Sequence, residues 1–124
     1  MFRNDAQRSA AARVLLRSVR QEHLWDERPT PLALRLFERD GGYLSSGERM
    51  MLFIAWEVWD AGASDGKAGV GQCMAKLDYP QLRLLGSFFT AFSGGAIAID
   101  RWLVEHKACA PLDGSVKEVE HVSE

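Results

Sequence analysis

Residues 44–61 read LSSGERMMLFIAWEVWDA and form the longest strongly apolar run in the chain. The run begins with a signal for a helix N-terminus. The Ser45 hydroxyl can accept a hydrogen bond from a free backbone amide of the first turn, and the Glu48 side chain can accept one from the Ser45 amide. Leu44, just before this capping box, is placed to pack as a hydrophobic staple. These signals predict a helix over about 45–61.

The apolar side chains of this helix cover too wide an arc for a helix that lies on a surface. Wound at about 100° per residue, they span roughly 200°. They are Met50, Met51, Leu52, Ile54, Ala55, Val58, Trp59 and Ala61. We therefore expect this helix to be central, with the other helices packed around it.

The remaining arc of the helix holds two large aromatic residues among three charged ones. Its members are Arg49, Phe53, Trp56, Glu57 and Asp60. Trp and Arg are good anchors of a protein interface when polar groups surround them, so this face is our candidate partner-binding surface. In the competing interpretation the central helix is covered all round, and Trp56 belongs to the core.

Length and composition indicate one small globular domain. The chain has 124 residues and a net charge of −2, which gives no general attraction to nucleic acid or anionic lipid. No segment has the apolar length of a membrane span, and the N-terminus lacks the apolar core of a signal peptide. We therefore expect a cytoplasmic protein. Its helical domain should span 1–109 and be followed by an acidic, disordered tail over 110–124. Cys73 and Cys109 are expected to be reduced thiols with a structural role.

Two further helices are expected in the N-terminal half. Asn4 or Asp5 can cap a first helix running to about Leu24. Residues 28–31, RPTP, break the chain, because a residue before proline is pushed out of the helical region. Thr30 and Pro31 then start a short helix, which Asp40-Gly41-Gly42 ends. The apolar face of this short helix is Leu32, Ala33, Leu36 and Phe37.

The C-terminal half carries signals for three more helices. The first is short, spans 72–77 and buries Cys73, Met74 and Leu77. Asp78 and Gln81 form a second capping signal, with Pro80 in the first turn of a long helix. The apolar face of that helix is Leu82, Leu84, Leu85, Phe88, Phe89 and Phe92.

Gly86 lies inside the long helix, where glycine lowers helix stability, so we expect a neighbouring helix to approach there. Ser93-Gly94-Gly95 interrupts the run. A last helix over about 96–107 contributes Ile99, Trp102 and Leu103 to the core. Since no segment alternates with period two, the predicted fold is all-α, an irregular array of five or six helices around residues 45–61.

The Gly-rich stretch 62–71, GASDGKAGVG, is the natural place to look for a ligand loop. A Walker A loop does not fit, because the Gly62 to Gly66-Lys67 spacing is one residue short and Ala68 has no hydroxyl. An EF-hand register would put Ala61 and Ala63 at positions that need oxygen ligands. A dinucleotide-binding turn lacks its third glycine and its strand. The stretch is interpreted as a mobile connector between helices.

The remaining chemistry-bearing residues form no recognisable reactive site. Zinc needs four ligands in closed spacing, but only His106 and Cys109 lie together, and His23 and Cys73 would have to arrive by folding. We expect no metal and no cofactor. The sequence around each cysteine and each serine does not match a known motif for a catalytic nucleophile.

Glu57 and Asp60 lie one helical turn apart, but no second group is present to separate the pKa values of this carboxylate pair for acid-base catalysis. Because the helix dipole disfavours a negative charge near a helix C-terminus, Asp60 is expected to have an Arg or Lys partner. These residues do not predict an enzyme.

Three functions follow, in decreasing order of support. The first is a non-catalytic helical interaction module, an adaptor, regulator or assembly subunit, that binds another protein or itself through the candidate face.

The second is a nucleic-acid-associated subunit that contacts phosphates, or an acidic partner, through a basic line on the first helix. That line is Arg13, Arg17 and Arg20, at four- and three-residue spacing, and Arg8 is a further candidate contact. Acidic residues just downstream, and a would-be recognition helix with apolar instead of polar side chains, count against nucleic acid. The third is a small-ligand-binding protein or enzyme built around residues 62–71.

Overall fold

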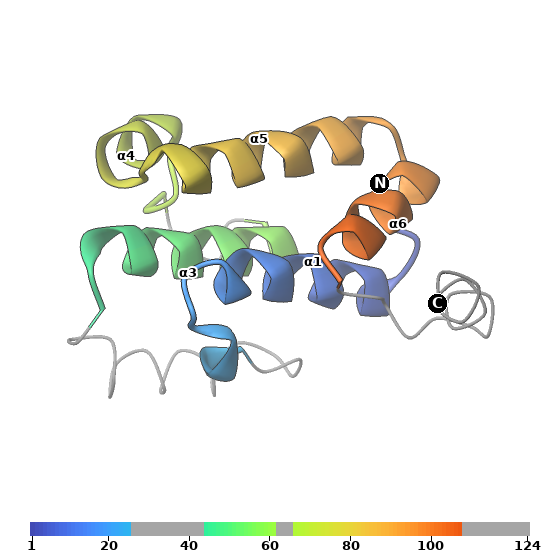
Figure 1. The fold of residues 1–124 in the computed structure, drawn as a ribbon, viewed down its shortest axis with the longest axis horizontal. Helices are drawn as coiled ribbons and strands as arrows, with labels where there is room; N and C mark the ends of the chain where they lie inside the picture. Colours follow the sequence, from blue (N-terminus) through green and yellow to red (C-terminus); the bar gives the residue numbers. More distant parts are fainter. Residues whose placement is uncertain (26–43, 62–65, 108–124) are drawn as a thin grey trace.

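The structure is a computed structural model that describes residues 1–25, 44–61 and 66–107. The secondary structure of these residues is helical, with turns between the helices and no strand, which confirms the predicted all-α class (Figure 1). The elements are α1 (Asp5–Arg17), the 3₁₀-helix η1 (Glu22–Leu24), α3 (Ser46–Trp59), α4 (Val70–Lys76), α5 (Tyr79–Ser93) and α6 (Ala96–Glu105). The predicted short helix after Pro31 and the predicted tail over 110–124 lie outside the described residues.

The centre of the fold is the pair α1 and α3, which lie side by side and run in opposite directions (Figure 1). α3 is buried without interruption from Met50 to Trp56, so it is the central helix that the apolar run predicts. Its capping box is confirmed: the Glu48 amide donates to Ser45 Oγ at 3.2 Å, and the Ser45 amide donates to Glu48 Oε1 at 2.7 Å.

α1 ends at Arg17, seven residues earlier than Leu24, where the sequence predicts its end. The cause is Arg20, whose φ of 62° is left-handed. The Gln21 amide donates to the Leu16 carbonyl at 2.9 Å and the Arg20 amide to the Arg17 carbonyl at 3.0 Å, which is the Schellman pattern that closes a helix. Glycine usually holds that left-handed position, so arginine there gives no sequence signal for a helix end.

α5 lies over the α1–α3 pair (Figure 1) and is anchored at its start and along its second half. At its start, the predicted capping box of Asp78 and Gln81 is present, with amide-to-side-chain distances of 3.1 and 3.0 Å. This α4–α5 corner packs closely on Gly47 of α3, where a Cβ atom would lie 3.1 Å from Gln81 Oε1. In its second half, the Phe88 ring packs on Trp102 of α6 with 5.3 Å between centroids.

α6 folds back from the end of α5 and packs against α1 (Figure 1). The predicted break occurs at Gly95, whose φ is 93°. The three core residues predicted for this helix, Ile99, Trp102 and Leu103, are all buried. In the part of the chain that the structure describes, no helix is long and apolar enough to cross a membrane.

A buried polar cluster joins α6 to α1. Gln7 is fully buried, and its Nε2 donates to the Ala96 carbonyl at 2.8 Å and to Asp100 Oδ1 at 2.9 Å. Arg3 closes the cluster with an ion pair of 2.6 Å to the other Asp100 oxygen. The polar groups of Gln7 are therefore satisfied inside the fold, as buried polar groups must be.

Candidate functional site

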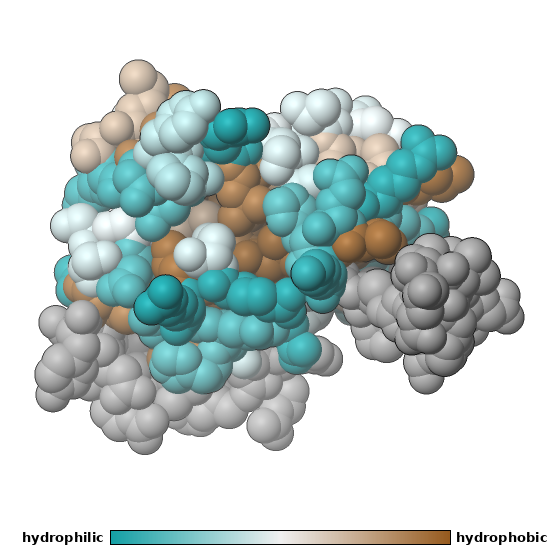
Figure 2. Space-filling model, viewed as in Figure 1, coloured by the Kyte–Doolittle hydropathy of each residue, from teal (hydrophilic) through white to brown (hydrophobic). Residues whose placement is uncertain are grey.

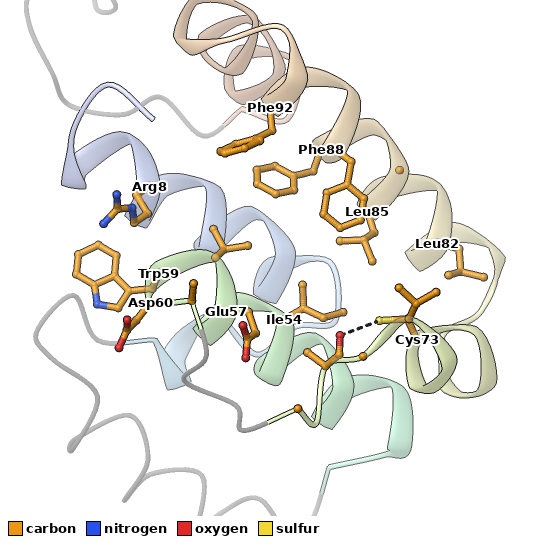
Figure 3. Close-up of a pocket in the computed structure, with 18 of the residues that line it drawn as sticks. Arg8, Ile54, Glu57, Trp59, Asp60, Cys73, Leu82, Leu85, Phe88 and Phe92 are labelled. Carbon is orange, nitrogen blue, oxygen red and sulfur yellow. Dashed lines mark hydrogen bonds between the residues drawn. The ribbon is translucent and has the colours of Figure 1, made fainter. Parts of the chain in front are cut away.

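A pocket of about 910 Å³ lies between α5 and the α1–α3 pair (Figure 3). Its floor is the second half of α3, its opposite wall is α5, and α4 with the turn before it closes one end. Phe2 closes the other end, where its ring packs edge-on against Phe92 with 5.2 Å between centroids. The lining residues of α3, α4 and α5 are Ile54, Glu57, Val58, Trp59, Asp60, Val70, Cys73, Met74, Leu82, Leu85, Gly86, Phe88, Phe89 and Phe92.

The pocket leaves large apolar side chains in contact with solvent. Val70 is 76% exposed, Met74 71% and Phe89 57%, while Leu82 and Phe92 are more than one third exposed. Figure 2 shows apolar side chains in the hollow between α5 and the central pair. Monomeric proteins seldom leave such side chains grouped together, so this surface is the strongest candidate for a binding site.

Two sequence predictions are corrected here. The sequence places Met74, Leu82, Phe89 and Phe92 in the core, but the structure buries only Leu85, Phe88 and Ala91 of α5. Gly86 was expected to permit close approach of a helix, yet a Cβ atom there would meet nothing within 4 Å. α5 packs on the core through Leu85 and Phe88, which lie in one buried cluster with Ile54 of α3. Leu82, Gly86, Phe89 and Phe92 lie on the part of its surface that stays open to the pocket and to solvent.

The polar groups of the pocket lie mostly on α3. Glu57 and Asp60 project from its last turn, opposite the apolar residues of α5 (Figure 3). Asp60 is the exposed C-cap residue of α3, and within the described residues it makes no ion pair, so the Arg or Lys partner expected for it is not found there. Arg8 is the lining residue with a positive charge, and its guanidinium lies over the Phe2 ring at 5.6 Å.

Cys73 contributes a thiol to the pocket wall. Its Sγ donates to the Ala68 carbonyl at 3.7 Å. Burial raises the pKa of the Cys73 thiol above its ordinary value, which favours the protonated thiol over the reactive thiolate.

The predicted partner-binding face is not a single exposed surface. Phe53 is 9% exposed and Trp56 4%, since both pack in a cluster with Leu24 and Trp25. The turn after α1 places Leu24 and Trp25 over the two rings. The ammonium of Lys67 also lies 5.5 Å from the centre of the Phe53 ring. Arg49 and Asp60 are exposed and Glu57 is half-buried. Of the five predicted residues, Glu57 and Asp60 line the pocket.

The four candidate arginines of the N-terminal segment do not form one surface either. Arg8 and Arg13 are five positions apart on α1, which turns their side chains about 140° from each other, and Arg8 lines the pocket. Arg17 holds Glu22 through two hydrogen bonds of 3.2 and 3.1 Å. Arg20 belongs to the turn that ends the helix.

Glu22 neutralises part of this basic line. The hydrogen bond from Arg17 lowers the pKa of Glu22 below its usual range, and the charges of Arg17 and Arg13 act in the same direction against the effect of burial. Arg17 also donates to the carbonyls of His106 and Lys107, each at 3.4 Å. The Arg17 guanidinium therefore connects the end of α1 to the end of α6.

Side chains that bind metals do not gather in the described residues, which contain no group of three or more His, Cys, Asp or Glu suited to a metal ion. The His106 ring packs on Trp102 with 4.8 Å between centroids. Its predicted neighbour Cys109 lies outside the described residues.

Comparison of this chain with protein-family models, with curated proteins and with solved structures found no match.

Proposed function

We propose that this chain is a non-catalytic interaction module that binds another protein through the pocket between α5 and α3. One observation carries the proposal: large apolar side chains of α4 and α5 line an open pocket and remain exposed there. Burying such a surface is favourable by roughly 25 cal/mol per Å². A protein segment that covered Val70, Met74 and Phe89 together would gain most from it.

The location of the site therefore differs from the face that the sequence favours, while the class of function stays the same. Phe53 and Trp56 support the fold in this proposal. Glu57 and Asp60 remain site residues, now as the polar edge of the pocket. A role as adaptor, regulator or assembly subunit in the cytoplasm belongs to the same proposal.

The nucleic-acid alternative has weaker support. Arg17 is occupied by Glu22 and by two carbonyl groups, and phosphate binding would have to break that arrangement. Binding that weakens steeply between low and physiological salt would favour this alternative.

Site-specific photocrosslinking tests the proposal. A photoreactive amino acid is placed at Phe89 in the full chain, and a matched one at Ile97, which is 64% exposed and lies outside the pocket lining. In cells of the native host, we expect one crosslinked protein from position 89 and none from position 97. The substitution Phe89→Ser should abolish capture of the same protein by an affinity tag, whereas Ile97→Ser should not.

The proposal fails if positions 89 and 97 crosslink equally or if neither does. Thermal melting of both serine variants supplies the control for folding. Since both side chains are more than half exposed, neither substitution should change the melting temperature by more than a few degrees.

A further inference from the structure

We infer that the pocket accepts an amphipathic α-helix of another protein, and that this helix carries a Lys or Arg which binds at Asp60. The inference rests on the proposed function and adds the shape and the charge of the partner segment.

The spacing of the apolar residues on α5 points to a helix as the occupant. The exposed residues of α5 that line the pocket are Leu82, Gly86, Phe89 and Phe92, at steps of four, three and three residues. Steps of three and four keep these residues on one face of the helix, the face along which a second helix packs. In a helix each residue rises 1.5 Å, so the stripe is about 15 Å long and matches roughly three turns of a partner helix.

Gly86 adds a place for an inserted side chain. It lies within the stripe and lines the pocket, and a Cβ atom built on it would meet nothing within 4 Å. Helices pack by inserting a side chain of one into a space between side chains of the other. The open surface at Gly86 offers that space to a large apolar residue of the partner.

The negative charge at the end of α3, on the side of the pocket across from α5, determines which polar residue the partner needs. Asp60 is exposed at the C-cap of α3, where the last carbonyl groups of the helix add negative potential. Glu57 lies one turn earlier and lines the same wall (Figure 3). Arg8 lies over the Phe2 ring, and its Nη1 is 3.4 Å from Asp5. A cation that flanks the apolar stripe of the partner complements this wall.

Selection from a displayed peptide library tests both parts of the inference. The library is a helical Ala/Gln scaffold of about five turns, randomised at three seam positions and at two flanking positions near each end. Selection runs in parallel on the full-length chain and on its Asp60→Lys variant. Lysine suits a helix C-terminus, so this variant should melt like the wild type.

We expect the wild type to enrich large apolar residues at the seam and Lys or Arg at one flank. The Asp60→Lys variant should enrich the same seam with Asp or Glu at that flank. A peptide selected on the wild type should bind Asp60→Lys about tenfold more weakly, as a change from attraction to repulsion at one partly exposed pair implies. The substitution Phe89→Ser should abolish binding of both peptide sets.

The other outcomes separate this inference from the proposed function. An apolar seam with no charge preference, unchanged by Asp60→Lys, overturns the inference and leaves a protein-binding pocket. Failure to enrich any helix, together with a Phe89-dependent thermal shift on adding decanoate, overturns both in favour of a small apolar ligand. A wild-type dimer in solution that Phe89→Ser dissociates also overturns the inference, because a second copy then occupies the stripe.

Discussion

The indole Nε1 of Trp102 donates a hydrogen bond of 2.9 Å to the Ser87 hydroxyl, which in turn donates to the Leu84 carbonyl at 2.6 Å. This chain of two hydrogen bonds joins α6 to the middle of α5. It explains how α5 keeps its place beside a pocket of about 910 Å³: α6 supports the helix from outside the pocket.

Removing the Ser87 hydroxyl should therefore weaken the fold. The substitution Ser87→Ala leaves the Trp102 donor without its acceptor, and Trp102 is only 3% exposed. We expect a loss of about 1–2 kcal/mol in the free energy of unfolding, measured by urea denaturation. The matched control is Ser93→Ala, since Ser93 Oγ is exposed and bonds only to the Thr90 carbonyl. Equal losses in both variants would contradict a specific role for the Trp102–Ser87 bond.

Gln7 should show the cost of an unsatisfied polar group. Gln7→Leu removes the donor to the Ala96 carbonyl and to Asp100, and we expect a loss of about 1–3 kcal/mol. Gln7→Glu places a second carboxylate beside Asp100, so its loss should be larger at pH 7 and should shrink towards pH 4, as one carboxylate takes up a proton. The measurement is urea denaturation at both pH values. A Gln7→Glu variant with no pH-dependent recovery would show that the two carboxyl groups do not face each other.

Acid should weaken the fold through Glu22 and Glu48. The hydrogen bond from Arg17 lowers the pKa of Glu22, and the backbone amide of Ser45 lowers that of Glu48. Each folded pKa is below the unfolded value, so the stabilisation is complete above the unfolded pKa and is lost as pH falls through the folded pKa.

The test is the urea midpoint from pH 7 to pH 3. We expect a decline that starts below about pH 5, with a shallower decline in Glu22→Gln, which lacks one of the two groups. An identical slope in Glu22→Gln and the wild type would rule out Glu22 as a contributor.

Trp56 and Phe89 should respond to truncation in opposite ways. Trp56 is 4% exposed and Phe89 57%. We expect Trp56→Ala to cost about 3–5 kcal/mol, and Phe89→Ala to cost less than about 1 kcal/mol. Thermal and urea unfolding measure both. A stable Trp56→Ala variant that lost partner binding would restore the face around Arg49 and Trp56 as the interface.

The sequence predicts those parts of the fold that depend on neighbours along the chain. Both capping boxes, at Ser45 and at Asp78, are visible because a polar cap and its partner are three residues apart. The break at Gly95 is visible because glycine accepts its positive φ. The end of α1 cannot be predicted from the sequence, because Arg20 adopts a left-handed conformation that is uncommon for arginine.

The candidate site depends on contacts that are distant in sequence. An apolar pattern does not say which apolar residues are covered, so the exposure of Phe89 and the burial of Phe88 look alike in the sequence. The wide apolar arc of α5 is the signal that was available: a helix with apolar residues on more than one side needs more than one neighbour. In the same way, the burial of Phe53 and Trp56 follows from the position of Trp25, which only the fold supplies.

The double glycine between α5 and α6 also affects whether α6 packs on its own chain or on a second one. Gly95 has a φ of 93°, and a Cβ atom on Gly94 would lie 2.8 Å from that of Ala98. If this corner were straightened, α5 and α6 would join into a rod of about 27 residues, roughly 40 Å long. Trp102 and Leu103 would then be carried away from their own α1 and could cover the α1 of a second chain. The backbone conformation at Gly94 and Gly95 thus keeps α6 packed on the α1 of its own chain, and straightening it would allow domain swapping, the exchange of α6 between two chains.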